Sequence, residues 1–288
     1  MNTLPDILVQ GVLLGALYAL FAMGQSLVFG VMRLTNIAHG DFIVLLVFLL
    51  FALTAIAQLP LAVAVVLLVV IAFAAGYLLQ YTLLNRVSSR DPLPSLMVTF
   101  GLSIVIQNVL QELFSADPRS IGAGGFESRS VLLPGGISVG YLPLLTLVAT
   151  VAITVALQWV FGRTALGRAF RATSDDREIV QLMGVSHRPT YALAMGIAFV
   201  LIAVAAGFYA MRTAVSPSDG PALLLYAFEA VIIGGMGSFW GTFLGGLALG
   251  VAQQIGFHLD PGWGVWLGHV MFLAVLVARP QGLLPKTA

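Results

Sequence analysis

The sequence predicts an all-α integral membrane protein of about eight transmembrane segments, and three observations support this. Of its 288 residues, 59% are hydrophobic and only 9% are charged, against about 25% charged in a soluble domain. Lipid must therefore solvate most of the outer surface. Its long apolar stretches, such as 61–73, do not alternate polar and apolar residues as barrel strands do. Helices, which satisfy their own backbone hydrogen bonds, are thus expected to cross the membrane.

Stretches of about 20 apolar residues can cross the hydrocarbon core. The first candidate is too long for a signal peptide, and no basic residue precedes Arg33, so we expect a retained span. No segment between the spans is long enough for a second core, so residues 1–288 are expected to form a single transmembrane domain. The candidate spans lie near 5–31, 38–57, 60–84, 94–114, 143–162, 189–211, 222–257 and 263–278.

Two of these regions are predicted to be broken or re-entrant. The stretch 222–257 is long and glycine-rich and follows Pro221, which favours two half-helices over one straight span. The polar segment 32–41 lies between two apolar runs and is expected to be irregular backbone inside the membrane.

The arginines predict the orientation, because basic loops stay in the cytoplasm. Arg86 and Arg90 follow the third span, five arginines lie within 163–188, and Arg279 and Lys286 follow the last span. These regions share one side if 222–257 dips into the membrane and returns. The loop 115–142 and the N-terminus are then external, and the C-terminus is cytoplasmic.

The segment 163–188 predicts a short capped helix in the cytoplasmic loop. Ser174 or Asp175 can cap it, with Glu178 completing a capping box, and Gly184 is placed to end it. Ile179, Leu182 and Met183 form an apolar face at helical spacing that can dock on a partner. A solvated loop that merely obeys the charge rule explains the arginines equally well.

Four segments carry a resemblance to the branched-chain amino acid permeases, which are membrane subunits of ABC importers. The segment 163–188 resembles their cytoplasmic coupling loop. The segments 35–42, 229–238 and 279–284 are similar to three further family motifs, in the family's order, so the resemblance runs from about residue 10 to the end. It points to the smaller of the two permease subunits. The residues that match the coupling loop are Gly167, Arg168, Ala169, Arg171, Ala172, Leu182, Gly184 and Val185.

The resemblance implies a permease subunit in the bacterial inner membrane that forms half of the path for branched-chain or related small amino acids. It also implies the partners, which are a second permease chain, related but not identical, two cytoplasmic ATPase subunits and an external solute-binding protein. The coupling residues toward the ATPases would be Gly167, Arg168, Arg171, Asp175, Asp176, Glu178, Leu182 and Gly184.

The composition agrees with this division of labour. The chain has no G-x-x-x-x-G-K-[ST] phosphate loop, and its only lysine is Lys286. ATP and Mg²⁺ are therefore expected on the ATPase partners, and this chain is not expected to be an enzyme. It has no cysteine, so a disulfide framework and a thiolate metal site are excluded. No metal, cofactor or nucleic acid is expected to bind it.

Polar residues within spans are costly and usually face the bundle interior, which makes them candidates for the substrate path. Thr99, Ser103, Gln107 and Gln111 recur at intervals of four and share one helix face. Their hydroxyls and amides donate and accept, so they suit a zwitterionic solute. They suit a hydrogen-bonded contact between helices equally well.

The polar segment before the second span supplies three more candidates for the path, Asn36, His39 and Asp41. They can line the path or cap a half-helix that starts at about Gly40. The positive end of such a half-helix can meet a substrate carboxylate.

Glu229 is one of very few carboxylates inside a span. We expect it to be protonated or paired with Arg212, as a gating group or as a structural anchor. Gly234 and Gly235 follow it and are also candidates for the path. Glycine pairs at 237/241, 241/245 and 246/250 favour close helix packing over substrate contact.

Other interpretations stay open. A permease of the same type can carry urea, amides or small organic acids. A proton-coupled secondary transporter would use Asp41 and Glu229 as coupling carboxylates. An intramembrane hydrolase built on Ser238 has no supporting motif order.

Overall fold

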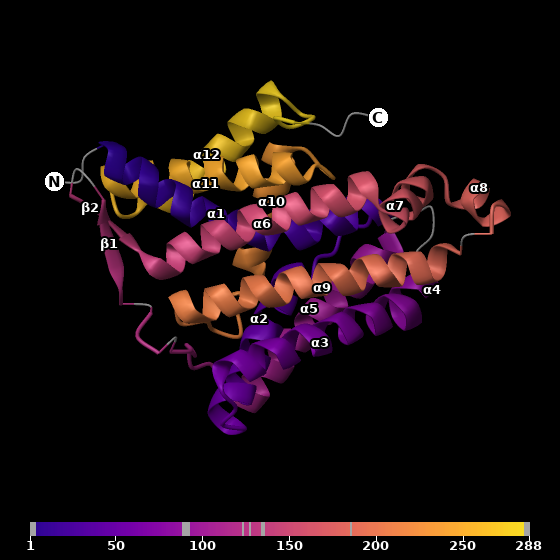
Figure 1. Cartoon of the computed structure of the whole chain (residues 1–288), viewed down its shortest axis with the longest axis horizontal. Coiled ribbons are helices and arrows are strands. Elements are labelled where there is room, and N and C mark those ends of the chain that lie inside the picture. Colours follow the sequence, from indigo (N-terminus) through magenta and orange to yellow (C-terminus); the bar gives the residue numbers. More distant parts are fainter. Residues whose placement is uncertain are drawn as a thin grey trace.

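A computed structural model describes residues 4–87, 93–122, 124–126, 128–133, 136–184 and 186–284, and in this part the chain forms a bundle of long helices (Figure 1). Six helical runs are long and apolar enough to cross a membrane. A bent pair, α10 (Gly220–Gly234) with α11 (Phe239–Leu259), and the shorter α12 (Trp263–Ala278) follow them. The predicted helical membrane fold with about eight segments is confirmed.

The six runs correspond closely to the predicted spans. They are α1 (Leu4–Met32), α2 (His39–Phe51) with the π-helical turn η1 (Ala52–Ile56), α3 (Leu61–Leu79) with η2 (Gln80–Leu84) and α4 (Asn85–Val87), α5 (Leu93–Phe114), α6 (Tyr141–Arg163) and α9 (His187–Arg212). Strands β1 (Ser130–Leu133) and β2 (Ile137–Gly140) precede α6, and helices α7 (Ala165–Asp175) and α8 (Arg177–Leu182) connect α6 to α9.

Both predicted breaks are present. The helices α10 and α11 meet at an angle of 118°, and the turn between them places Gly235 at φ +109° and Gly237 at φ +79°. L side chains rarely adopt such positive φ values, so glycine is required at this bend. The segment 33–38 is irregular, and α2 begins only at His39.

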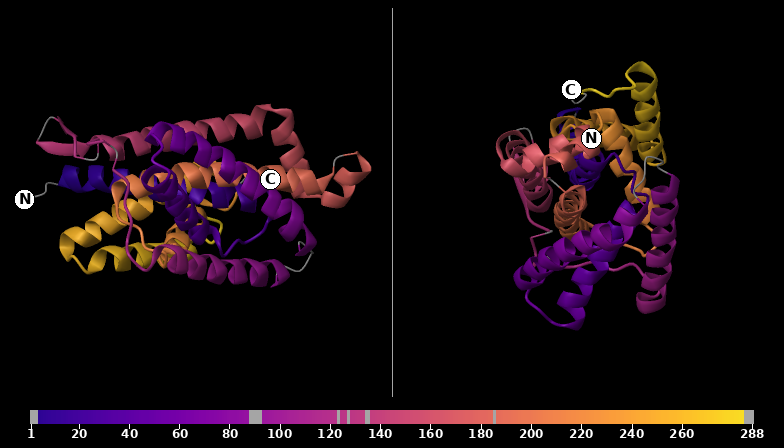
Figure 2. Two further views of the ribbon diagram at one scale, coloured as in Figure 1. Left: turned by 90° about the horizontal axis from the view of Figure 1, so that it is seen from below. Right: turned by 90° about the vertical axis from the view of Figure 1, so that its right-hand side faces the viewer.

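Helices α1 and α9 form the centre of the bundle. In an apolar 18-residue stretch of each, 72% of the residues are buried, whereas only 22% are buried in the corresponding stretches of the runs that contain α3 and α6. Helices α3 and α6 lie at the outside of the bundle (Figure 2). Many of their apolar side chains are exposed, which suits contact with lipid or with partner subunits. Glycines allow the central crossing of α1 and α11: Gly15 packs against the backbone of Gly246 and Gly250, and Gly11 packs against Val251. The close-packing interpretation of this glycine pattern is confirmed.

Eight of the helices pack as two matching sets of four. The first set is α1, α2, α3 and α5, and the second is α9, α10, α11 and α12. Helix α3 packs against α9 as α11 packs against α1, and both pairs run antiparallel. Helix α2 contacts α5 as α10 contacts α12, and α2 and α10 contact each other. The leading helices of the two sets, α1 and α9, are themselves antiparallel, since Gly24 lies beside Ala198 and Phe21 beside Tyr209. This is the packing of an inverted repeat, an arrangement that many transporters use.

The arginine-bearing connections gather at one end of the bundle. The elements α4, α7 and α8 lie at the right of Figure 1, whereas the N-terminus and the β-hairpin lie at the left. The C-terminal tail belongs to the α8 end, because the N–H groups of Leu283 and Leu284 bond to the carbonyls of Ile233 and Gly234 at the end of α10. Arg90 and Lys286 lie outside the described residues.

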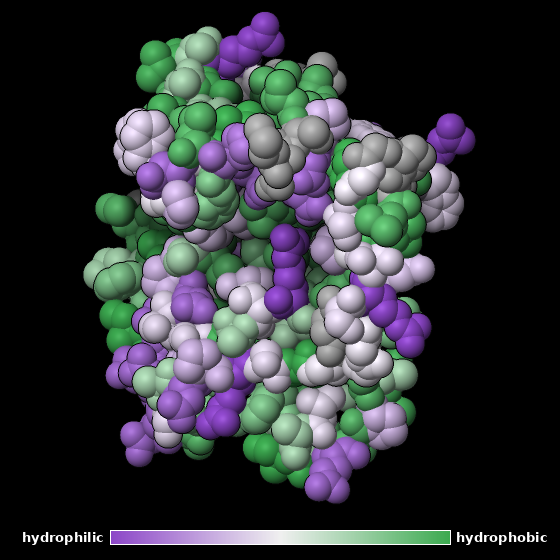
Figure 3. Space-filling model, turned by 90° about the vertical axis from the view of Figure 1, so that its left-hand side faces the viewer, coloured by the Kyte–Doolittle hydropathy of each residue, from purple (hydrophilic) through white to green (hydrophobic). Residues whose placement is uncertain are grey.

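The opposite end carries a hairpin that the sequence did not predict. Strands β1 and β2 pair antiparallel, with Ser130 opposite Gly140. Gln10 donates to the carbonyl of Ser138 at 2.9 Å and so ties the hairpin to α1. Seen from this end, hydrophilic and hydrophobic side chains intermix across the face (Figure 3), which suits a surface that meets water outside the hydrocarbon core.

We expect Gly250→Ala to destabilise the bundle, because an added methyl group would overlap the backbone of Gly15 and lie 2.5 Å from the carbonyl oxygen of Gly11. Overpacking of this kind costs about 1–3 kcal/mol. The measurement is the melting temperature of the detergent-solubilised chain. Gly101→Ala is the matched control, since a methyl group there meets nothing within 4 Å. Equal melting temperatures for the two variants would show that α1 and α11 can move apart at their crossing without loss of stability.

Candidate functional site

Two half-helices begin inside the bundle and touch at their first turns. A methyl group at Gly40 of α2 would overlap the carbonyl oxygen of Gly220 of α10 and lie 2.6 Å from the backbone nitrogen of Leu224. His39 donates from Nε2 to the carbonyl of Phe21 at 2.8 Å, which places this contact in the middle of α1. We call the first turns of α2 and α10 and the side chains around them the half-helix junction.

The irregular segment that leads into α2 is held by hydrogen bonds. Asn36 accepts from the N–H of Ala38 at 3.1 Å, and Thr99 of α5 accepts from the N–H of Ile37 at 3.2 Å. Asn36 and His39 are buried, and each keeps one polar atom without a partner among the described residues. In this conformation both side chains act as internal supports of the junction.

Asp41 does not cap α2, so the proposed capping role is wrong. It lies within the first turn of α2, three residues after the capping position, Ala38, and no side chain caps the helix there. Its carboxylate accepts from Gln107 of α5 at 2.9 Å, and its second oxygen is buried without a partner in the described part of the chain. The carboxylate therefore lies near the positive end of α2, where a negative charge is favourable.

The polar face of α5 divides into two parts. Thr99 and Ser103 are buried, and Gln107 is half-buried and also donates to Ser103 at 3.2 Å. Thr99 bonds to the segment before α2, and Gln107 bonds to Asp41 of α2 and to Ser103, which favours the helix–helix interpretation for these three residues. Gln111 is exposed on the outer surface of the chain and stays apart from the junction.

Glu229 of α10 is buried and pairs with His269 of α12, with 2.5 Å between Oε1 and Nδ1. The expected pairing with Arg212 is therefore wrong. Tyr226, one turn before Glu229, stacks on the His269 ring at 6.4 Å. Sequence analysis missed His269 as a partner, because no local pattern relates two residues that are 40 positions apart.

Gly234 and Gly235 lie where α10 ends. Gly234 packs against the backbone of Gly241, and Gly235 packs against Gly282 of the C-terminal tail. Both glycines contact protein on these sides in this conformation.

The cytoplasmic segment forms two helices where one was predicted. Thr164 caps α7 by accepting from the N–H of Gly167 at 3.1 Å, and Asp176 caps α8 by accepting from the N–H of Ile179 at 3.1 Å. The predicted cap at Ser174 or Asp175 is wrong, because both belong to α7 and Ser174 donates to the carbonyl of Gly30. The Glu178 side chain lies outside the described residues.

Helix α8 projects beyond the end of the bundle (Figure 1). Ile179, Leu182 and Met183 are 57%, 89% and 78% exposed, while Val180 is buried and anchors the segment. Gly184 ends it at φ +84°, as predicted. Of the other expected coupling residues, Gly167 is buried against α6, Arg171 is half-buried, and Arg168, Asp175 and Asp176 are exposed.

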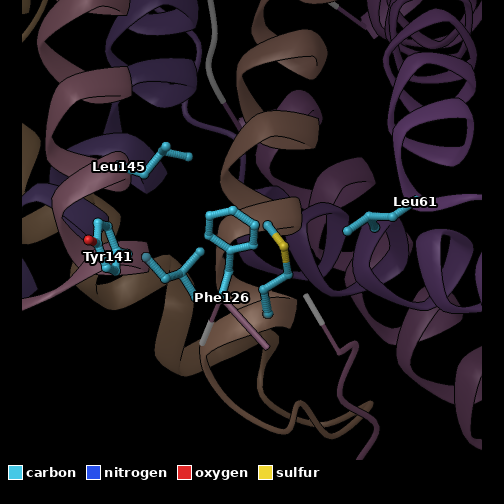
Figure 4. A pocket seen from close by; sticks show the side chains of 6 residues that line it. Leu61, Phe126, Tyr141 and Leu145 are labelled. Carbon is cyan, nitrogen blue, oxygen red and sulfur yellow. The ribbon is translucent and has the colours of Figure 1, made fainter. Parts of the chain in front are cut away.

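At the opposite end, an apolar pocket of about 300 Å³ lies between α3, α6 and α9. Tyr141 and Leu145 of α6 and Leu61 of α3 face it from either side, with Phe126 of the connecting loop between them (Figure 4). This lining has no charged group and suits hydrocarbon better than a polar solute. Among the residues that the structure describes, no cluster of three or more His, Asp or Glu side chains could hold a metal ion.

Residues 7–279 match the model of a family described as the branched-chain amino acid transport system/permease component. The chain belongs to this family. It is 31% identical to the high-affinity branched-chain amino acid transport system permease protein BraD of Pseudomonas aeruginosa, over 97% of this chain and 95% of the relative. It is 28% identical to the permease protein LivH of Escherichia coli K12, over 96% and 94% of the two chains.

A second permease protein of the same Escherichia coli system, LivM, is 32% identical over 43% of this chain and 30% of its own length. Members of the branched-chain permease family are transport subunits. The half-helix junction is therefore the central feature of a permease.

We expect Gln107→Leu to lower the stability of this permease, because it removes the donor to the buried Asp41 carboxylate. Leaving such an acceptor unpaired costs about 1–3 kcal/mol. Gln111→Leu is the matched control on the same helix, since Gln111 is exposed. Melting temperature and uptake are measured for both variants. If Gln107→Leu melts like the wild type but transports poorly, Gln107 acts on the solute and not as a helix contact.

Proposed function

We propose that this chain is the transmembrane subunit of an ATP-driven importer and forms half of the translocation path for branched-chain or related small amino acids. The family match over residues 7–279 carries this proposal. The relatives' names supply the substrate class. Two half-helices that begin at the middle of the bundle support it, because many transporters bind their solutes beside such helix ends.

The expected partners are two cytoplasmic ATPase subunits, a related second permease chain and an external solute-binding protein. The ATPases would bind ATP and Mg²⁺. Both LivH and LivM match this chain, which favours a second permease that is not identical. In the bacterial inner membrane, the α8 end would face the cytoplasm and the N-terminus and hairpin would be external.

The contacts of α7 offer a route from the ATPase to the path. Ser174 donates to the carbonyl of Gly30 at 2.9 Å, and a methyl group at Gly30 would lie 3.2 Å from Gly237 in the α10–α11 bend. Rings also connect the same elements: Phe161 of α6 contacts Phe170 of α7 at 5.4 Å and Phe239 of α11 at 4.9 Å. A displacement of α8 and α7 would therefore act directly on the bend, and α10 leads from that bend to the half-helix junction.

A panel of solutes tests the substrate class. The importer is expressed with its partner subunits in cells that lack their own branched-chain uptake, and uptake of labelled leucine, urea, acetamide and lactate is compared. Leucine should enter in an ATP-dependent manner that survives collapse of the proton gradient. Uptake that stops with the proton gradient would favour the secondary transporter with Asp41 and Glu229 as coupling groups, and uptake of urea or lactate alone would reassign the substrate.

Leu182→Asp should uncouple transport, because it places a charge on the most exposed apolar residue of α8. We expect leucine uptake and co-purification of the ATPase both to fall about tenfold or more, as for loss of an apolar anchor at an interface. Leu132→Asp is the matched control: Leu132 is 74% exposed, but it lies in the hairpin at the other end. Normal ATPase association of Leu182→Asp would argue against α8 as the docking helix.

Single cysteines test the orientation cleanly, since the native chain has none. We expect an impermeant maleimide on intact spheroplasts to label Ser128→Cys in the outer loop and not Ala172→Cys in α7. Both positions are exposed. After lysis both should react, which controls for local access, and the opposite pattern in intact spheroplasts would invert the topology.

A further inference from the structure

A cavity of about 340 Å³ lies between α1, α9 and α10, in the half of the bundle that holds the N-terminus and the hairpin. Its size falls within the range of roughly 300–1,000 Å³ that is typical of small-molecule sites. Leu14 and Leu17 of α1 and Leu223 of α10 supply an aliphatic wall. None of the path candidates from the sequence lines it.

The polar side of this cavity carries hydrogen-bond donors that the protein does not use. Arg212 ends α9, and its guanidinium forms no hydrogen bond or ion pair with any residue in the described part of the chain. The hydroxyls of Tyr209 and Tyr226 are likewise without a partner there, whereas Tyr18 donates to Gln253 at 2.6 Å. Glu229 forms no ion pair with Arg212 in the described part of the chain, and its Oε1 is bonded to His269.

The chemistry of these groups selects a carboxylate. A guanidinium presents a planar fork of donors that matches a carboxylate, and two phenol hydroxyls can add to it. The aliphatic wall fits a hydrocarbon side chain. The stacked rings of Tyr18 and Tyr226, 4.8 Å apart, offer a π surface for an ammonium group.

We propose that this cavity binds amino acids with aliphatic side chains at the outer side of the permease, with Arg212 as the ligand of the α-carboxylate. The choice of an amino acid rests on the proposed function. The preference for a carboxylate rests on Arg212, Tyr209 and Tyr226 alone.

Thiol labelling of the full chain in nanodiscs of zwitterionic lipid tests the site without transport. Thr213→Cys places a reactive group in the cavity wall. L-leucine should slow its reaction with a maleimide, and 4-methylpentanoate, which keeps the carboxylate, should slow it as well. Leucinol, which lacks the carboxylate, should not. A cysteine at Ser128 in the outer loop controls for general effects of the ligands.

Substitutions in the Thr213→Cys background then assign the carboxylate ligand. Arg212→Gln should raise the leucine concentration for half-protection about tenfold or more, as expected for loss of a charge-assisted hydrogen bond. Arg212→Lys should raise it less, because the charge remains. Arg129→Gln is the matched control, since that arginine lies over the Phe126 ring in the outer loop. Unchanged melting temperatures confirm that the variants fold.

Protection by leucinol equal to that by leucine, or protection that survives Arg212→Gln, would overturn the inference. Leucine uptake by the complete importer is measured separately. If the importer takes up leucine but neither leucine nor 4-methylpentanoate protects the cysteine at position 213, the site is ruled out and the proposed function is left intact. If carboxylate ligands protect this cysteine in a manner that depends on Arg212, but the importer carries no amino acid, the proposed function is ruled out and the site is supported.

Discussion

Helices that begin inside a membrane must find protein partners for their first N–H groups, because lipid offers none. Helices α2 and α10 both begin at the middle of the bundle, and the rest of the structure is arranged around this requirement. Asn36 and Thr99 bond the backbone just before α2, and Asp219 accepts from the N–H of Ser216 before α10. Gly40 and Gly220 then let the two helix starts approach until they touch. Asn36, Thr99 and Asp219 thus satisfy backbone N–H groups at the two places where the chain is broken inside the bundle.

The two buried carboxylates obey a second constraint, which is the cost of burying a charge. Each lies on a half-helix and is bonded from the outer helix of its own set, Asp41 by Gln107 of α5 and Glu229 by His269 of α12. A buried charge is tolerable only when it is paired and hydrogen-bonded. These contacts therefore fix α5 and α12 to the half-helices. Any movement of α5 or α12 during transport would therefore pull on α2 or α10, the two half-helices.

Glycine sets how closely the remaining elements approach, since helices in lipid associate through packing and not through exclusion of water. Gly15 and Gly250 bring α1 and α11 into backbone contact, and Gly235 and Gly237 bend the chain between α10 and α11. The tail closes over this bend through the N–H groups of Leu283 and Leu284. The bend also contacts Gly30, which α7 reaches through Ser174, so the cytoplasmic end and the centre of the bundle share one set of contacts.

The sequence by itself determined the spans, the presence of a break within 222–257, the irregular segment before α2 and the end of α8 at Gly184. The length and hydropathy of a segment and the conformational preference of glycine are local properties, so they can be read from the sequence without knowledge of tertiary contacts. Only the tertiary structure decided what the intramembrane polar groups bind. It paired Glu229 with His269 and left Arg212 facing a cavity. It also joined Thr99 to the segment before α2 and Gln107 to Asp41 and Ser103, and it left Gln111 exposed. It also moved the cap of α8 to Asp176, because α7 continues through Ser174 and Asp175. Partners of this kind lie far apart in the chain, and helix packing alone brings them within bonding distance.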